Sequence, residues 1–420
     1  MQSRDEYLNT VCEQIRFRAA RKTIRSEIEA HIDDRIAEGK SETEAIAAMG
    51  DAIQTGKALS RIHRPRLEWR VILCMLLLSA VSTVLSFSMT EYGSYIFPSG
   101  VFGEMVRPML YGLILMAGMY LLKYSLLERL KYVFYGAGLL YAGLYILTFE
   151  PFNNNILLTQ TPVIVISTLF LILGFIGIIS QSTKRTVPDF IILTVLSIAA
   201  IVVIYVISSV SALILAAMLI TVFTVSRWKQ KAHNWPLMSV YTGIIAASLV
   251  LCYFLIIRGY YGFNTDAFSD NNGEAQYLLG KSYFIGQSKY CGWTLENSRS
   301  SFVITAIIGM YGWLPGLLAA AVCGTMGVLM VLKASRIAHT YGRLLAVGIS
   351  VYFLVRFMLH FLANMGVIGG YFSLPFLSFG RFEFLSDAVL LGAFLSVWRR
   401  STYMKDEAKE MGLIKRSAEA

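Results

Sequence analysis

The segment VRFMLHFLAN (residues 355–364) places polar side chains inside a long apolar run. Arg356, His360 and Asn364 follow one another at intervals of four residues, so on an α-helix they lie within one narrow stripe. An arginine that faces lipid near the middle of a bilayer costs at least ~2.5 kcal/mol on insertion scales. We therefore expect this stripe to face the interior of a helical bundle or a hydrated cavity.

The composition of the chain indicates a membrane protein. Of its 420 residues 56% are hydrophobic and only 15% are charged, which is more apolar surface than a soluble core can bury. The net charge of +10 is concentrated in short loops between apolar runs, so it indicates membrane topology rather than nucleic-acid binding. We expect an all-α, polytopic helical protein in a lipid bilayer, with no nucleic-acid partner.

Ten apolar runs follow Glu68, and we expect about ten transmembrane helices. The runs cover about residues 69–89, 106–123, 131–149, 162–181, 190–206, 209–226, 237–257, 301–332, 342–364 and 383–398. The fifth and sixth form one uncharged stretch, which we divide at ISSVS (207–211). An unbroken helix there would be roughly 50 Å long, well beyond a ~30 Å hydrocarbon core.

Lysine and arginine occupy alternate loops between these runs. The loops at 90–105, 150–161 and 365–380 contain neither residue, whereas the intervening loops contain several. The positive-inside rule then predicts a multi-pass protein of the cell membrane with both termini in the cytoplasm. The longest loop, residues 258–300, is expected to be extracellular, and long loops on a helical scaffold are often functional.

The first 66 residues are charged and predict a small cytoplasmic helical domain without a cleavable signal peptide. Isoleucine recurs at every fourth position from Ile24 to Ile36, which gives a charged helix one apolar edge. Ser41 and Glu44 form a capping box after Gly39, and Gly50 marks a second break. We expect domains at 1–66 and 67–400 and a cytoplasmic tail at 401–420.

The five cysteines are scattered along the chain without metal-ligand spacing. Cys291 is expected to face the outside and has no obvious partner, whereas the others lie in apolar helices or the amino-terminal segment. We therefore expect no disulfide and no metal site built from cysteine.

The segment NMGVIGGYFSLPFLSFGRFEFLSDAVLLG (364–392) resembles a motif of the SEDS family (shape, elongation, division and sporulation; FtsW/RodA/SpoVE-like). In that family an Asn-bearing ninth span precedes a re-entrant loop reading roughly PFLSYGGSS, and then the tenth span. Here residues 375–380 read PFLSFG, and Arg381 replaces the second glycine. LENSRSSFVITAIIGMYGWLPG (295–316) resembles the family segment that opens span eight. Residues 7–65 separately resemble a permease-prefix domain found ahead of some Gram-positive membrane proteins.

The resemblance implies a membrane glycosyltransferase that polymerises lipid-linked disaccharide-pentapeptide into peptidoglycan, usually beside a transpeptidase partner. It implies no organic cofactor and allows a divalent cation. The family's general base is an Asp whose position falls on Ser301, and a serine hydroxyl cannot usefully accept a proton near neutral pH. Either this protein does not polymerise glycan, or a neighbouring carboxylate, first of all Glu296, replaces the base. Whether it is an enzyme stays open.

Six residues are candidates for contact with the substrate: Arg107, Arg356, His360, Asn364, Ser378 and Gly380. The arginines suit phosphate, because a guanidinium donates two parallel hydrogen bonds. Arg107 is alternatively an interfacial side chain, and Arg356 alternatively forms a structural ion pair with Asp387 or Glu383. Ser378 and Gly380 belong to the re-entrant loop, which is tolerated at membrane depth only where protein buries it or it lines a cavity.

Three functions stay open at this point. The first is a divergent SEDS protein of cell-envelope synthesis, in cell shape, division or sporulation, that binds the lipid-linked precursor. The second is a non-catalytic scaffold or regulator that docks a partner through residues 1–66. The third is a flippase for a polyprenyl-linked precursor.

Overall fold

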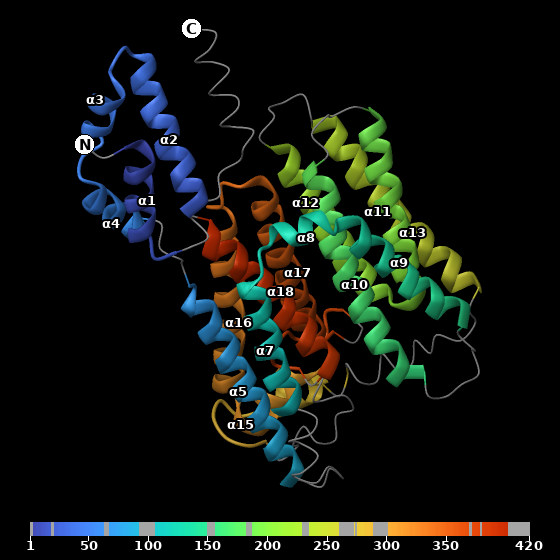
Figure 1. Cartoon of the computed structure of the whole chain (residues 1–420). Coiled ribbons are helices and arrows are strands. Elements are labelled where there is room, and N and C mark those ends of the chain that lie inside the picture. Colours follow the sequence, from blue (N-terminus) through green and yellow to red (C-terminus); the bar gives the residue numbers. More distant parts are fainter. Residues whose placement is uncertain are drawn as a thin grey trace. The chain divides into compact units, whose positions relative to one another are not determined.

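The computed structural model describes most of the chain, and over these residues it contains helices and no strand (Figure 1). The described residues are 3–17, 21–62, 67–91, 106–148, 156–181, 187–228, 235–259, 273, 275–288, 301–368, 372–378 and 380–401. The chain divides into two compact units, one of residues 1–67 with 398–420 and one of residues 68–397.

The N-terminal unit contains four helices around a small apolar core. They are α1 (Arg4–Gln14), α2 (Arg21–Ala37), α3 (Glu42–Ala47) and α4 (Ala52–Ile62). The predicted capping box begins α3, because the Ser41 hydroxyl accepts from the Glu44 N–H and the Glu44 carboxylate accepts from the Ser41 N–H. The second hydrogen bond also lowers the pKa of Glu44. Gly39 and Gly50 have φ of 91° and 81°, which ends the preceding helices as predicted.

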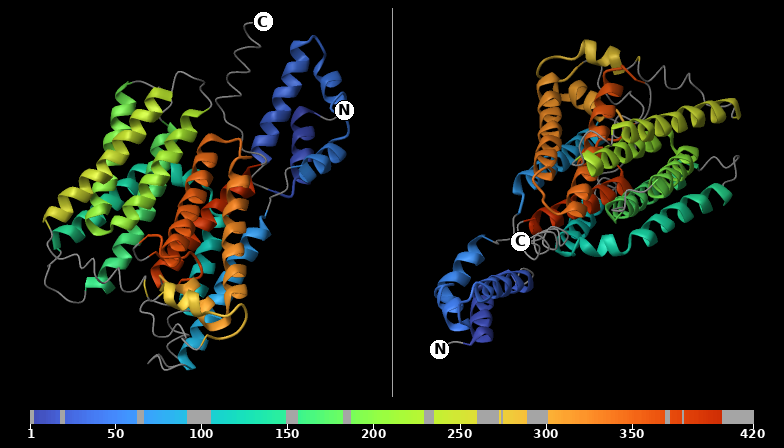
Figure 2. Two further views of the ribbon diagram at one scale, coloured as in Figure 1. Left: turned by 180° about the vertical axis from the view of Figure 1, so that it is seen from behind. Right: turned by 90° about the horizontal axis from the view of Figure 1, so that it is seen from above.

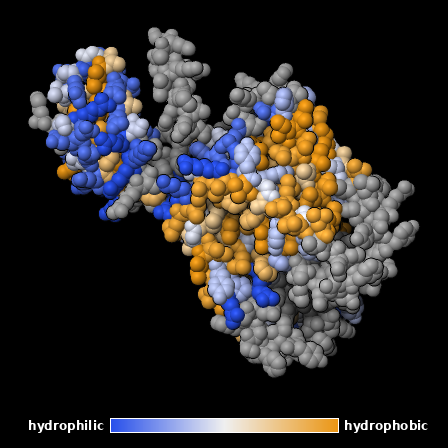
Figure 3. All heavy atoms as spheres, turned by 45° about the vertical axis from the view of Figure 1, so that its right-hand side comes forward, coloured by the Kyte–Doolittle hydropathy of each residue, from blue (hydrophilic) through white to orange (hydrophobic). Residues whose placement is uncertain are grey.

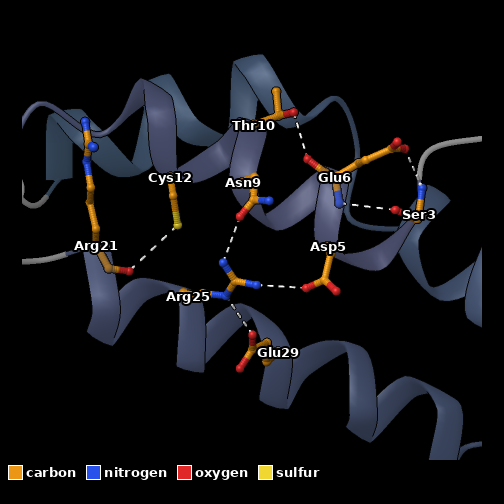
Figure 4. A network of polar contacts seen from close by, with 9 residues as sticks. All are labelled: Ser3, Asp5, Glu6, Asn9, Thr10, Cys12, Arg21, Arg25 and Glu29. Carbon is orange, nitrogen blue, oxygen red and sulfur yellow. Dashed lines mark hydrogen bonds and ion pairs between the residues drawn. The ribbon is translucent and has the colours of Figure 1, made fainter.

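The apolar edge predicted on α2 lies against α1 and α3. Ile24, Ile28 and Ile32 are buried in the core with Tyr7 and Leu8, whereas Ile36 is 37% exposed. At the surface, the Arg25 guanidinium donates to Asp5 Oδ1 (2.8 Å), Asn9 Oδ1 (2.8 Å) and Glu29 Oε1 (3.0 Å), linking α1 to α2 (Figure 4). Exposed ion pairs contribute little to stability, so the apolar core is the main source of stability in this unit.

The second unit is a bundle of apolar helices. Its helices are α5 (Trp69–Glu91), α7 (Arg107–Leu121), α8 (Ser125–Arg129), α9 (Lys131–Thr148), α10 (Ile156–Gln181), α11 (Val187–Ile207), α12 (Ser209–Trp228), α13 (Trp235–Gly259), α15 (Val303–Tyr311), α16 (Trp313–Ala334), α17 (Thr340–Asn364) and α18 (Arg381–Arg400). Apolar side chains cover much of its surface (Figure 3). Within the described residues, α5, α10, α11, α12, α16 and α17 are long and apolar enough to cross a membrane. The prediction of an all-α polytopic membrane protein is confirmed.

The fifth and sixth predicted spans are separate helices, as expected from the length of the apolar stretch. α11 ends at Ile207 and α12 begins at Ser209. Ser208 caps α12, because its hydroxyl oxygen accepts a hydrogen bond from the Ser211 N–H at 3.2 Å.

The prediction of one continuous helix over 301–332 was wrong. The helix breaks at Gly312, whose φ of 100° and ψ of 172° are accessible only to glycine, so that α15 and α16 are distinct. A Cβ at Gly312 would lie 2.7 Å from the Phe284 carbonyl oxygen. Segment 282–288 supplies backbone partners on both sides of the break, which an apolar run read by itself does not reveal.

Close helix packing brings the beginnings of α7 and α18 together. A Cβ at Gly112 would lie 2.6 Å from a ring carbon of Phe384, and one at Gly392 would lie 2.6 Å from the Met116 carbonyl oxygen. Glycines at these positions let the two helices approach within backbone contact. α17 packs against α10, α12 and α16, so its polar stripe lies inside the bundle.

Candidate functional site

The centre of the bundle contains a buried ion pair between α17 and α18. Arg356 and Asp387 are 5% and 1% exposed, and Nη1 of Arg356 donates to Asp387 Oδ1 at 2.5 Å. The same guanidinium donates to Tyr352 Oη at 3.1 Å and, through Nη2, to Ser373 Oγ at 2.7 Å. Of the two predicted carboxylate partners of Arg356, Asp387 makes the contact. The guanidinium therefore joins α17, α18 and the connection between them.

His360 lies one turn further along α17 and contacts the same connection. Its Nδ1 is 2.6 Å from the Phe372 carbonyl oxygen, and its Nε2 is 3.2 Å from Asn364 Nδ2. A carbonyl can only accept and an amide nitrogen can only donate, so we assign a neutral imidazole with its proton on Nδ1. Both ring nitrogens are thus occupied by protein groups.

Asn364 joins the end of α17 to the beginning of α15. Its Oδ1 accepts from the Thr305 N–H at 3.1 Å and from Thr305 Oγ1 at 2.9 Å. Its Nδ2 donates to the carbonyl oxygens of Ser301 at 2.8 Å and His360 at 2.9 Å. The N-cap residue of α15, Phe302, makes no side-chain cap. Asn364 therefore caps α15 from another helix, next to Ser301.

The connection between α17 and α18 contains buried backbone outside any helix. The Ser378 hydroxyl accepts from the Leu374 N–H at 2.6 Å, and the Ser82 hydroxyl of α5 donates to the Leu377 carbonyl at 2.6 Å. Phe376 has a φ of 62°, a left-handed conformation that is uncommon for a non-glycine residue. Its ring packs between Phe353 and Phe384. Protein groups thus satisfy this backbone, as membrane depth requires.

A small pocket lies between this connection, α5, α7 and the beginning of α18. Its lining includes Ser79, Thr83, Pro108, Phe376, Ser378 and Gly380. Arg107 directly precedes Pro108 at the beginning of α7, and Arg381 directly follows Gly380 at the beginning of α18; both are exposed. Two exposed cationic residues are therefore adjacent in sequence to residues that line the pocket. A Cβ at Gly380 would lie 2.6 Å from Glu383 Oε2, which places a carboxylate beside the lining as well.

The predicted site residues thus fall into two groups. Arg356 is buried with Asp387, and His360 and Asn364 are buried with the Ser301 carbonyl; both sets contact the connection between α17 and α18 at Phe372 and Ser373, and we call these residues together the buried network. Ser378 and Gly380 line the pocket, with Arg107 beside it. Ser301 itself is 6% exposed. Glu296 lies outside the described residues.

Sequence reasoning did not single out two residues near these groups, Ser373 and Arg381. Ser373 was not singled out because nothing in the sequence shows that the connection folds back onto Arg356. Arg381 was noted only as a departure from the family motif. The signal that could have found it is its position, because Arg381 lies at an end of the bundle whose neighbouring loops, 90–105 and 365–380, contain no lysine or arginine.

A divalent cation, which the resemblance allows, would need several carboxylates close together. Among the described residues, no group of three or more His, Cys, Asp or Glu side chains could hold a metal ion. Asp387 is already hydrogen-bonded to Arg356. Cys12, Cys74 and Cys323 are free thiols, and Cys291 lies outside the described residues.

The N-terminal region matches a known family model. The HAAS model matches residues 6–55, which lie inside the N-terminal unit. A search of curated proteins found no match to the sequence.

Solved structures show which fold the rest of the chain has. A chain of a peptidoglycan synthase complex, described for the structural coordination of polymerization and crosslinking, superposes with a TM-score of 0.62 at 16% identity over 81% of this chain and 99% of its own length. The rod shape determining protein RodA of Thermus thermophilus superposes with a TM-score of 0.57 at 15% identity over 80% of this chain and 97% of its own. A point mutant of RodA gives the same score. The transmembrane unit therefore has the RodA fold, the fold of the SEDS family that its sequence motifs resemble.

Proposed function

We propose that this protein is a divergent SEDS-type membrane protein of peptidoglycan synthesis that binds a lipid-linked disaccharide-pentapeptide. The proposal places the pyrophosphate of that precursor at the pocket between α5, α7 and α18. The observation that carries it is the position of the family-like PFLSFG segment, whose Ser378 and Gly380 line the pocket beside Arg107 in a RodA-like fold.

The edge of the pocket, rather than its interior, would receive a pyrophosphate joined to a lipid, because the cavity has a volume of about 10 Å³, which is room for about one water molecule. Arg107 and Arg381 are exposed and directly adjoin the lining residues Pro108 and Gly380 in sequence, and arginine binds phosphate oxygens through paired hydrogen bonds. The Ser79 and Thr83 hydroxyls lie in the lining. Leu110 on α7 and Phe382 on α18 are 51% and 40% exposed beside the two arginines, so an acyl-like chain could lie against them in the bilayer. The precursor would then enter from the side, within one leaflet.

The buried network has a different role in this proposal. Three hydrogen bonds of the Arg356 guanidinium go to Asp387, Tyr352 and Ser373. The Asn364 amide is likewise engaged on both of its polar atoms. A substrate could reach these groups only by breaking contacts with protein, so we propose that the network shapes the connection between α17 and α18 and does not bind substrate. The sequence left two roles open for Arg356, contact with the substrate and a structural ion pair, and this proposal adopts the structural ion pair.

Binding does not require a general base, whereas glycan polymerisation does. Ser301 cannot serve, so a polymerising enzyme would need another carboxylate. Glu296 stays the candidate nearest in sequence, and Glu383 is the carboxylate that the structure places beside the pocket-lining Gly380. The role in cell shape, division or sporulation, the cytoplasmic location of both termini and a transpeptidase-like membrane partner are further parts of this proposal.

Binding of the purified precursor to the full-length protein in nanodiscs tests the proposal directly. Arg107→Gln combined with Arg381→Gln should weaken binding of the lipid-linked disaccharide-pentapeptide, measured by native mass spectrometry. The matched control is Arg129→Gln combined with Arg336→Gln, which removes two exposed arginines at the opposite ends of the helices. Equal binding by both double variants would contradict the assignment of the pocket.

Two further measurements separate binding from the alternatives. If the native protein polymerises the precursor, Glu296→Gln and Glu383→Gln, tested one at a time, identify the general base. If the native protein does not polymerise it, gain of polymerisation in Ser301→Asp would show that the rest of the site is competent. A scaffold acting only through the N-terminal unit predicts no precursor binding at all and loss of the cellular phenotype on deletion of residues 1–66.

A further inference from the structure

Three consecutive large side chains project from segment 282–288 without cover from the described protein. Tyr283, Phe284 and Ile285 are 53%, 65% and 65% exposed. A cluster of this kind on the surface of a soluble domain would indicate a binding site or a liability for aggregation. Because this cluster lies in the transmembrane unit, lipid is a further candidate partner for it.

The backbone behind these side chains is fixed by the broken helix. Tyr283 and Phe284 accept hydrogen bonds from the N–H groups of Trp313 and Leu314, both at 3.0 Å. On the other side of the break, Gly286 donates to the Tyr311 carbonyl at 3.0 Å. The end of α15 and the beginning of α16 thus obtain their missing backbone partners from this segment. These hydrogen bonds hold the backbone of residues 283–286 at the break between α15 and α16.

The length of α16 places the segment at a membrane boundary. Lys333, near the far end of α16, pairs with Glu68 at 2.7 Å. The helix rise puts Trp313 ~30 Å from Lys333 along the axis, which equals the thickness of the hydrocarbon core. When the Lys333–Glu68 ion pair lies at one boundary of the hydrocarbon core, Trp313 and segment 282–288, which is hydrogen-bonded to it, lie at the other boundary. Figure 2 shows α15 and the adjoining helical residues 275–281 gathered at this same end of the bundle.

The exposed side chains continue an apolar surface that faces lipid. α16 presents an exposed stripe at helical spacing, made of Leu317, Leu318, Ala321, Val328, Val331 and Leu332. Segment 282–288 lies directly beyond the Leu317 end of this stripe, because Phe284 accepts from Leu314. Tyr277 is 53% exposed nearby, with the Lys281 ammonium 5.9 Å from its ring. Aromatic rings beside a lysine are typical of the boundary between acyl chains and headgroups.

We propose that residues 283–285 insert into the headgroup–acyl boundary of the adjacent leaflet and anchor the α15–α16 break to the lipid surface. The occupant is lipid rather than a protein partner, because the side chains continue the lipid-facing stripe of α16 at the depth where that stripe meets the headgroups. The inference is independent of the ligand proposed for the pocket. It adds a membrane-surface contact at the break between α15 and α16.

Depth-dependent fluorescence quenching tests this contact in the full-length protein. An environment-sensitive fluorescent amino acid is placed at position 285, and the protein is reconstituted in nanodiscs with nitroxide-labelled phosphatidylcholine. The label lies either next to the headgroup or near the end of the acyl chain. Position 321, on the α16 stripe and about 12 Å from Trp313 along the helix, and position 54, exposed on the N-terminal unit, are the matched controls.

The proposal expects blue-shifted emission at position 285, with stronger quenching by the shallow label than by the deep one. Position 321 should be quenched more strongly by the deep label, and position 54 by neither. Red-shifted emission at 285, quenched by aqueous iodide but not by either lipid, would overturn the proposal and leave the segment open to a protein partner. Cross-linking of the unsubstituted protein to a photoreactive phospholipid gives a second measurement, in which adducts on 283–285 support insertion and adducts confined to α16 contradict it.

Discussion

The buried network and the pocket lie close together in the bundle and differ in how their polar groups are satisfied. In the buried network, Arg356, His360 and Asn364 direct their hydrogen bonds to other protein groups. Beside the pocket, Arg107 and Arg381 are exposed at the beginnings of two helices. Burial makes an unmet polar group costly, whereas exposure leaves a cation available to a ligand. The comparison supports the proposal that the polar stripe on α17 stabilises the fold and that the two exposed arginines bind the precursor.

Removing the buried carboxylate should have the largest effect on stability. Asp387→Ala leaves the Arg356 charge buried without its partner, which costs about 3–5 kcal/mol of unfolding free energy. Glu383→Ala is the matched control, since Glu383 lies one turn away on the same helix and is only half-buried. Thermal unfolding in detergent measures both. Equal melting temperatures for the two variants would mean that the ion pair does not stabilise the fold.

Cutting the contact between α17 and α15 should have the next largest effect. Asn364→Ala leaves the Thr305 N–H and the Ser301 carbonyl without their partner, at a cost of about 1–3 kcal/mol. Hydrogen exchange at the amides of 303–305 should accelerate as α15 frays. Gln276→Ala, which removes an exposed side chain with one long contact to Gly366, should leave both measurements near those of the native protein. Unchanged protection of α15 in Asn364→Ala would contradict the cross-helix cap.

The other end of α15 gives a comparable test that depends on backbone conformation. Gly312→Ala forces a side chain into a glycine-only conformation against the Phe284 carbonyl, and a residue held in such a region costs about 1–3 kcal/mol. Gly324→Ala on the same α16 has nothing within 4 Å of the added Cβ, and should be neutral or stabilising. A lower melting temperature for Gly324→Ala than for Gly312→Ala would show that Gly312 does not determine the break.

The pocket arginines should have the smallest effect on stability. Arg107→Gln and Arg381→Gln change exposed side chains, so each should alter the free energy of unfolding by less than about 0.5 kcal/mol. Precursor binding should nevertheless weaken in each variant. A large loss of stability would place these residues with the buried network and remove the distinction between the two regions.

Hydrophobic runs predicted most of the fold, because in a bilayer the length of an apolar run limits the length of a helix. The division between α11 and α12 at Ser208 could be predicted in this way. The break at Gly312 could not, because its backbone partners lie some 30 residues away in segment 282–288, within a loop whose course the sequence does not reveal. Gly312 and Pro315 were the only local signals.

The candidate site was predicted less completely. The four-residue spacing identified Arg356, His360 and Asn364 as one inward stripe. The sequence offered Asp387 and Glu383 as partners of Arg356, and Asp387 makes the contact. The spacing could not show whether these side chains are hydrogen-bonded by the protein or available to a ligand. That difference depends on which protein groups lie within hydrogen-bond distance of them in the fold. Ser373 and the Thr305 N–H come from other parts of the chain and complete the network only in the folded protein.

Precursor binding by a variant that replaces the buried ion pair tests the division between the two regions most directly. Arg356→Met with Asp387→Leu removes both charges together, and such paired apolar replacements are often neutral or stabilising. The account predicts that this variant folds and binds the lipid-linked disaccharide-pentapeptide as native protein does, while Arg107→Gln with Arg381→Gln folds and loses binding. Loss of binding in the first variant, with binding kept in the second, would contradict it.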